Sequence, residues 1–133
     1  MAIYSGMGLD LPFSASGDLG DYQYLFVKAA SGKMRVDAAT GASDPVPIGV
    51  LQNDPYSEGA AVVRVAGVTK VSVSSSTAIS VGQLLMCGSD AKAELVNSDA
   101  SGYSGISLED IGAGTGYVSM LLRPMVTKMD GTR

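Results

Sequence analysis

Residues that could carry out chemistry are scarce in this chain. It has no histidine and a single cysteine, Cys87. A catalytic serine or thiolate needs a neighbouring base, most often histidine, and the common structural zinc sites need four ligands drawn from cysteine and histidine. Cys87 ends the apolar run "GQLLMCG", so we expect a small buried side chain and not a reactive thiolate.

The acidic residues and the glycine-rich run also lack the setting that chemistry requires. Neighbouring residues of a strand point to opposite faces, so Glu109 and Asp110 make a poor acid–base pair. Asp54 lies in "QNDP", which is typical of a turn. The run "GAGTG", Gly112 to Gly116, precedes the strand-like "YVSMLLRP". A phosphate-binding loop would be followed by a helix or a lysine, so the run is predicted to be a hairpin loop.

The hydroxyl-rich run "SVSSSTAIS", Ser72 to Ser80, is predicted to be solvated strand and loop, because no base and no Gly-x-Ser-x-Gly turn accompanies it. We therefore predict no catalytic, cofactor-binding or metal-binding residues and expect that the protein is not an enzyme. Met120 is predicted to lie in the core, whereas Met125 and Met129 fit an interface or plain exposure equally well.

Composition limits the partners. The length of 133 residues suggests one domain, with 46% hydrophobic and 17% charged residues and a net charge of −4. The scattered basic residues argue against nucleic-acid binding, and no apolar run approaches the ~20 residues that span a bilayer. The N-terminus lacks the pattern of a signal peptide, so synthesis in a cytoplasm is expected. The low charge means that the surface relies on serine, threonine, asparagine, glutamine and glycine for solubility, or that a partner covers part of it.

The elements that must position these residues are predicted to be strands. Turn signals recur along the chain, and 17 residues are glycine, which favours an all-β or nearly all-β small barrel or sandwich. At most a helical turn is expected, in "SLEDIGAG" with Ser107 as cap. The predicted strands are Tyr22–Ala30, 33–39 with Met34 and Val36 on one face, Ile48–Leu51, Ala60–Ala66, 68–76, Leu84–Cys87, 91–96, and a hairpin over Gly105–Arg123 ended by Pro124.

Residues 1–20 show neither a helical nor a strand period. They nevertheless carry apolar side chains among glycine, serine and aspartate, which a frayed terminus rarely does. We predict an extended N-terminal arm over residues 1–20, a β-rich domain over 21–126 and a loose tail over 127–133. The arm is expected to pack on a partner surface through Ile3, Tyr4, Met7, Leu9, Leu11 and Phe13.

One hairpin occurs twice. "IGVLQNDPYSEGAAVVRVAGV", starting at Ile48, aligns without a gap on "SGISLEDIGAGTGYVSMLLRP", starting at Ser104. The alignment places Gly49 on Gly105 and Val62 on Val118. A small barrel or sandwich needs several similar hairpins around one core, so the repeat predicts architecture and not a catalytic site. The identities are few, and chance similarity stays an alternative.

Several stretches resemble a known family. These are "DYQYLFVKAASGKMRVDAATG", "PVPIGVLQNDPYSEGAAVVRVAGVTKV", "AISVGQLLM" and "GISLEDIGAGTGYVSMLLRP". Together they resemble the head decoration, or cement, proteins of tailed bacteriophages, over roughly Asp21 to Pro124. The resemblance implies a β-tulip-like fold and a trimer on the outside of the capsid at three-fold or quasi-three-fold sites, clamping neighbouring major capsid subunits. The N-terminal arm would reach onto the shell.

Two other functions stay open at this stage. One is a trimeric fibre or tail module that binds a glycan on a host surface, which would need an exposed aromatic cluster. The chain has no tryptophan, two phenylalanines and six tyrosines, which argues against such a cluster. The other is a cellular structural or assembly domain.

Overall fold

The computed structural model describes residues 8–41, 46–96 and 102–127. The predicted all-β architecture is confirmed, since these ranges contain strands, turns and bends and no helix. All the strands belong to one continuous, sandwich-like sheet. They are β1 (Gly8–Ala15), β2 (Phe26–Ala30), β3 (Arg35–Ala38), β4 (Pro47–Leu51), β5 (Ala60–Ser75), β6 (Leu84–Cys87), β7 (Ala93–Leu95), β8 (Gly102–Ser107) and β9 (Gly114–Thr127).

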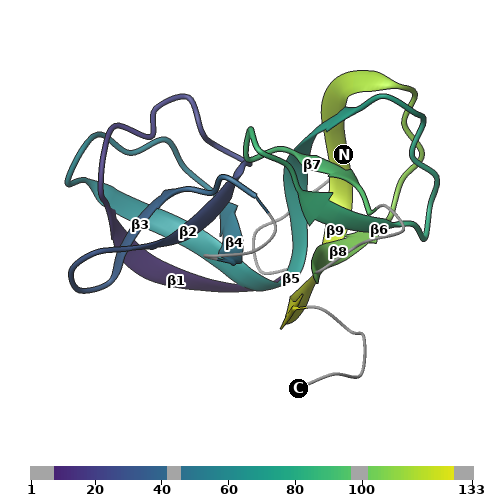
Figure 1. Cartoon of the computed structure of the whole chain (residues 1–133). Coiled ribbons are helices and arrows are strands. Elements are labelled where there is room, and N and C mark those ends of the chain that lie inside the picture. Colours follow the sequence, from purple (N-terminus) through teal and green to yellow (C-terminus); the bar gives the residue numbers. More distant parts are fainter. Residues whose placement is uncertain (1–7, 42–45, 97–101, 128–133) are drawn as a thin grey trace.

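The pairing closes the sheet into two rings that share β5. In the first ring β1 pairs with β3, β3 with β2, β2 with β4, β4 with β5, and β5 again with β1. In the second ring the order is β5, β7, β6, β8, β9 and back to β5. Figure 1 shows the two rings as two lobes, with the long strand β5 passing from one to the other.

The two rings have the same topology. In each ring the first strand in the pairing order pairs in parallel with its neighbour, β1 with β3 and β5 with β7, and the other pairs are antiparallel. The registers correspond as well: Val27 faces Gly49 in the first ring, and Leu85 faces Gly105 in the second. The chain is therefore a tandem repeat in which β5 ends one unit and begins the next.

The repeat seen in the sequence is thus a repeat in the structure, but its gap-free alignment is wrong by one residue after the turn. Leu51 pairs with Val63, whereas its counterpart Ser107 pairs with Met120. The connection in the second hairpin is one residue longer, so Val118 corresponds to Ala61 and not to Val62. Both Gly49 and Gly105 lie against backbone, and a Cβ there would come within 2.3 and 2.5 Å of a carbonyl oxygen.

Each ring holds its own core. The first is filled by Ala15, Leu19, Val27, Val36, Leu51, Ala61 and Val63. The second is filled by Val71, Val73, Ile79, Leu85, Cys87, Ala93, Val118, Met120 and Leu122, joined by Phe26, Ala39 and Val50 from the first ring. Equivalent positions are filled by apolar side chains in both, for example Val27 with Leu85 and Val63 with Met120. The two cores explain why a chain this small carries one hairpin twice.

Several local predictions are corrected. The two strands expected on either side of Gly67 are one strand, β5, which passes through that residue with φ 97°. Met34 precedes β3 with φ 52° and is exposed, so it does not share a strand face with buried Val36. Pro124 lies within β9. The expected helical turn is absent from the described residues 107–114, where Ile111 instead forms a bridge to Ile79.

The predicted arm also changes. Residues 8–15 are strand β1, which pairs with both β5 and β3, and Leu19 is buried in the first core. A boundary between residues 20 and 21 therefore does not separate an arm from the domain. The sequence hid this strand because one of its edges pairs with distant β5 and its outward residues Gly8, Asp10 and Pro12 break the apolar period. Of the predicted tail, only Thr127 lies within the described residues, and it ends β9.

Candidate functional site

Cys87 is buried, as the sequence predicts. Its thiol donates a hydrogen bond to the Gly88 carbonyl at 3.2 Å. Burial raises the pKa of the Cys87 thiol to about 12, so the reactive thiolate is almost absent at neutral pH. The residue packs as a small hydrophobic side chain.

The part of the chain that the structure describes brings no acidic side chains together into a metal site or an acid–base site. No group of three or more cysteine, aspartate or glutamate side chains there could hold a metal ion. The same residues contain no helix that could cross a membrane. Glu109 Oε1 instead accepts a hydrogen bond from the Ser119 backbone N–H at 2.7 Å. Asp110 Oδ1 accepts one from Val81 N–H at 2.8 Å.

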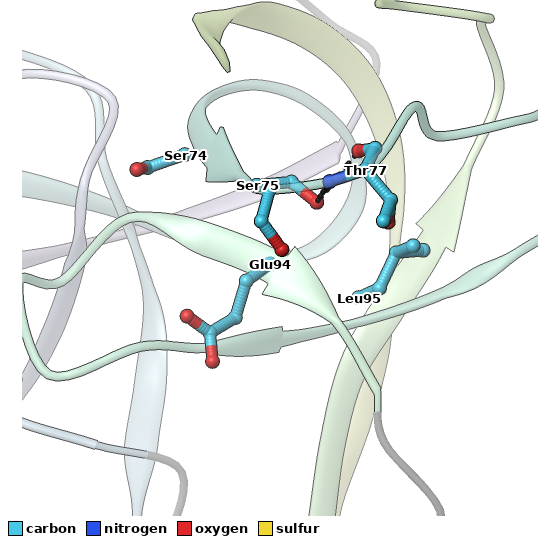
Figure 2. Close-up of a pocket in the computed structure, with 6 residues that line it drawn as sticks. Ser74, Ser75, Thr77, Glu94 and Leu95 are labelled. Atoms are coloured by element: carbon cyan, nitrogen blue, oxygen red, sulfur yellow. Dashed lines mark hydrogen bonds between the residues drawn. The ribbon is translucent and has the colours of Figure 1, made fainter. Parts of the chain in front are cut away.

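A hollow of about 230 Å³ lies beside the serine run, lined by Ser74, Ser75, Ser76, Thr77, Glu94 and Leu95. Figure 2 shows Ser75 and Thr77 on one side of this hollow and Glu94 and Leu95 of β7 on the other. The Ser75 hydroxyl donates to the Thr77 carbonyl at 2.8 Å and accepts from the Thr77 N–H at 3.3 Å. These hydroxyls therefore stabilise a turn, as expected for solvated strand and loop. Ser72 departs from that expectation, because it is buried.

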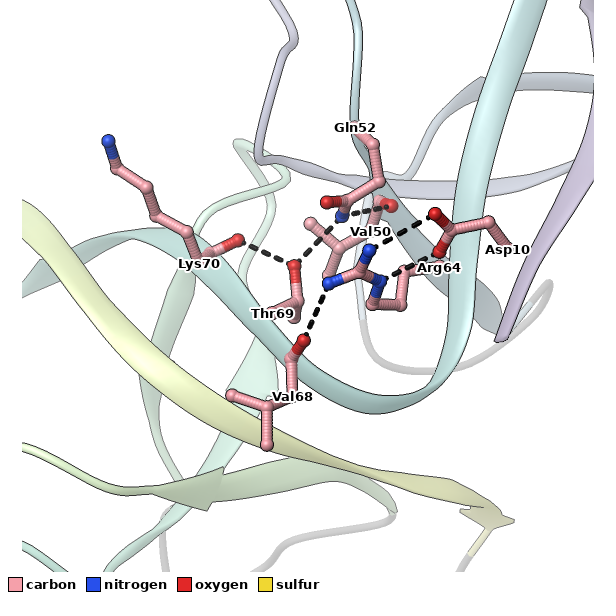
Figure 3. A network of polar contacts seen from close by, with 7 residues as sticks. All are labelled: Asp10, Val50, Gln52, Arg64, Val68, Thr69 and Lys70. Carbon is pink, nitrogen blue, oxygen red and sulfur yellow. Dashed lines mark hydrogen bonds and ion pairs between the residues drawn. The ribbon is translucent and has the colours of Figure 1, made fainter. Parts of the chain in front are cut away.

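A buried polar network lies where β5 passes between the rings (Figure 3). Arg64, whose exposed fraction is 3%, donates from Nε and Nη2 to the two carboxylate oxygens of Asp10, at 2.7 and 3.1 Å. Its Nη1 donates to the Val68 carbonyl at 2.8 Å. Gln52 Nε2 donates to Thr69 Oγ1 at 2.8 Å, and Thr69 in turn donates to the Lys70 carbonyl. The network fixes β1 and β4 to the turn of β5, which is a structural role.

Two tyrosines and a lysine gather on the outer face of the second ring. The rings of Tyr24 and Tyr117 meet edge to face with centroids 6.2 Å apart. Lys70 Nζ lies 4.9 Å from the Tyr24 centroid and 4.6 Å from that of Tyr117, within the range of cation–π attraction. Tyr117 is 54% exposed. The cluster joins the β1–β2 connection of the first ring to β5 and β9 of the second.

Beside this cluster, an apolar row crosses four strands of the second ring. The row consists of Leu84, Ile106, Leu121 and Val68, which are cross-strand neighbours on β6, β8, β9 and β5. Leu84 and Leu121 are 38% and 36% exposed, and Ile106 and Val68 are half-buried. We refer to these four residues as the outer row. Contiguous exposed apolar surface of this kind marks an interaction site.

The predicted arm residues are only partly within the described chain. Ile3, Tyr4 and Met7 lie outside it. Leu9, Leu11 and Phe13 lie on β1: Leu9 is exposed, Leu11 is half-buried, and Phe13 packs against the first core. β1 does not bring these three residues into one exposed patch.

The sequence reasoning missed the outer row and the tyrosine pair. The row could not be found from local sequence, since Val68 and Leu121 are distant in the chain and become neighbours only through the pairing of β5 with β9. One signal was available: alternation in "YVSMLL" places Tyr117, Ser119 and Leu121 on one face, opposite Val118, Met120 and Leu122. An exposed apolar residue on that face indicates contact with something beyond the core.

Comparison with known proteins shows a likeness in fold. No family model matches the chain, and no curated protein matches it. Among solved structures, it is similar to the crystal structure of the N base of the head fibre gp8.5 of bacteriophage phi29. The TM-score is 0.59 at 18% sequence identity, covering 92% of this chain and 98% of that one. At this identity the likeness shows a shared fold.

Proposed function

We propose that this chain is a structural protein of a bacteriophage virion, mounted on the outside of the head. The observation that carries the proposal is the fold shared with the base of the phi29 head fibre over almost the full length of both chains. The family-like sequence stretches between Asp21 and Pro124 support it independently. Both observations favour a protein of the phage head, one through the backbone fold and the other through the residue pattern.

We further propose that the protein works as a cement: a homotrimer at three-fold or quasi-three-fold sites that binds neighbouring major capsid subunits. Several weak sites joined in one trimer give avidity without a tight single interface. A protein of 17% charged residues and net charge −4 suits contacts made by apolar side chains and backbone. Residues Ile3, Tyr4, Met7, Leu9, Leu11 and Phe13 remain the proposed capsid contacts, with Leu9 the most exposed of those described.

The test is co-sedimentation with phage heads assembled without this protein. We expect saturable binding to the outer surface and a higher temperature of head rupture when the protein is bound. A variant lacking residues 1–7 leaves β1 whole and is the matched probe of the proposed contacts. Binding equal to the full chain would remove Ile3, Tyr4 and Met7 from the proposed contacts, and no binding by the full chain would contradict the cement function itself.

A second function is favoured by one observation. The exposed Tyr117, beside Tyr24, is the aromatic cluster that a glycan-binding fibre or tail module would need. Lys70 occupies the space over both rings, which leaves little free aromatic face for a sugar to stack on. A glycan array with the wild type and Tyr117→Ala separates the two functions: specific glycan binding lost in the variant would favour the fibre module.

A further inference from the structure

The contact between the two rings is built from one face of the first ring and one end of the second. Phe26, Val50 and Ala39 of the first ring are buried in the same cluster as the interior of the second. Two backbone hydrogen bonds join them: Phe26 N–H donates to the Ala91 carbonyl, and Ser72 N–H to the Tyr24 carbonyl, both at 2.9 Å. The outer face of β2 and β4 thus closes an end of the second ring.

Because the rings are repeats, each residue of that contact has a counterpart. The covered face of the first ring consists of Phe26, Val50 and Arg64, with exposed fractions of 0%, 0% and 3%. Their counterparts by register are Leu84, Ile106 and Leu121, three residues of the outer row. These are partly exposed, so the face that is covered on the first ring is open on the second.

The end of the second ring that contacts the first ring shows the opposite pattern. Ala91, Val71 and Cys87 receive the first ring and are fully buried. Their counterparts in the first ring are Met34, Phe13 and Ala29. Met34 is 57% exposed, Ala29 is exposed and Phe13 is half-buried. Ala91 and Met34 share positive φ values, 68° and 52°, at the same place before the third strand in each unit, which confirms that they correspond.

Each molecule therefore exposes the counterparts of both surfaces that meet in its internal contact between the two rings. We infer that the outer row of one copy packs against the end of the first ring that carries Met34, Phe13 and Ala29 in a second copy. Such a head-to-tail contact uses two different surfaces of each copy, and it closes into a ring or continues as a filament. Terminal units of repeat proteins need such a cover because their apolar faces lack the next repeat.

The contact between copies differs from the internal one in one respect. In the second ring, the strand end Tyr24–Phe26 inserts between Ser72 and Ala91. In the first ring the corresponding place is closed, because Ser14 N–H already donates to the Met34 carbonyl at 2.8 Å. Side chains and not an inserted strand must make the contact between copies. We expect it to be reversible and dependent on concentration.

This inference rests on the self-association in the proposed function and supplies its surface, but it does not depend on capsid binding. The test uses cysteine pairs in the full chain without capsids. Leu84 and Met34 are the counterparts of Phe26 and Ala91, which meet in the internal contact. A side-chain contact between copies should therefore bring residues 84 and 34 within disulfide reach. Leu84→Cys and Met34→Cys are prepared as separate proteins, each at an exposed site. Buried Cys87 does not interfere.

Under mild oxidation, the mixture of the two variants should give a disulfide-linked dimer on a non-reducing gel, and each variant alone should not. Leu84→Cys mixed with Tyr56→Cys, at another exposed site, is the matched control. Crosslinking of Leu84→Cys with itself, or equally with the control, would overturn the inference. A trimer by mass together with no crosslink in the mixture would also overturn it, while leaving the trimer of the proposed function intact.

Discussion

The first and second rings share one topology and use it differently. The first ring buries its outer β2–β4 face against its neighbour, through Phe26 and Val50. The second ring presents the corresponding face, with Leu84 and Ile106, to its surroundings. Equivalent positions in a repeat therefore take their character from what covers them, and an uncovered apolar counterpart points to a partner. Paired substitutions at equivalent positions test this directly.

The largest contrast is expected between Phe26→Ala and Leu84→Ala. Phe26 is fully buried at the contact between rings, whereas Leu84 is 38% exposed. Removing a buried phenylalanine should lower the free energy of unfolding by about 3–5 kcal/mol, and the exposed leucine should cost about 0.5 kcal/mol. Urea unfolding at a protein concentration low enough to keep copies apart measures both. Equal losses would contradict the correspondence of the two faces.

The glycines Gly49 and Gly105 should instead behave alike. A Cβ at either position would meet a carbonyl oxygen of the partner strand, Arg64 O or Leu121 O. Gly→Ala should therefore force the hairpins apart and cost about 2–3 kcal/mol in each ring. Gly112→Ala, where nothing lies within 4 Å, is the control, and thermal unfolding gives the comparison. A tolerated substitution at only one of the pair would break the equivalence of the hairpins.

A smaller effect is expected where the rings differ in polarity. Asp10 and Arg64 form an ion pair in the first ring, and their counterparts in the second are apolar Val68 and Leu121. Arg64→Leu alone should cost about 2 kcal/mol, because it leaves the Asp10 carboxylate without its partner. Adding Asp10→Val copies the second-ring pair and should recover most of that loss. A double-mutant cycle in urea checks this, and additive losses would show that the pair is not coupled.

The tyrosine cluster has no counterpart in the first ring. Because Tyr117 is largely exposed, its loss should weaken the contact between the two β rings only slightly. Tyr117→Ala removes an edge-to-face contact and one of the two aromatic rings beside Lys70. We expect a loss of about 0.5–1 kcal/mol in the free energy of unfolding. Tyr56→Ala, at an exposed tyrosine outside this cluster, serves as control. A loss above about 2 kcal/mol would assign the cluster a larger role in holding the rings together.

The smallest effect at neutral pH concerns Cys87. Its raised pKa, from 9.0 to about 12 through burial, means that the folded state holds the thiol proton more tightly than the unfolded chain. This contribution is constant below about pH 9 and is lost as the pH rises from 9 towards 12. We expect no reaction with a thiol reagent at pH 8 until the protein is unfolded. Rapid labelling of the native protein would show that the second core is open.

Much of the fold could be predicted from the sequence, because strand patterns and turn residues are local signals. The hairpin of Ile48 to Ala66 and the strand Leu84–Cys87 follow from apolar runs between glycines and turns. The strand β1 could not be predicted, since its partner β5 lies about 50 residues away and its own pattern is interrupted by Asp10 and Pro12. Sharing of β5 between two rings is likewise a property of long-range pairing.

The candidate surface was harder to predict than the fold. Apolar runs such as "LLM" and "MLL" do not show which member faces outward, so the exposure of Leu84 and Leu121 could not be predicted. Only the register of four strands places them in one row. The sequence-predicted contacts Leu9, Leu11 and Phe13 were inferred from composition alone, and β1 distributes them between surface and core.

The most direct test of the account is the mass of the purified full chain by light scattering at two concentrations, beside Leu121→Glu. Leu121 is 36% exposed, so the variant should fold and keep its unfolding temperature. We predict that the wild type associates with rising concentration towards three times its 13.5 kDa, and that the variant stays monomeric at both. A wild type that stays monomeric at both concentrations, or a variant that associates as well as the wild type, would contradict the use of the outer row as a contact between copies.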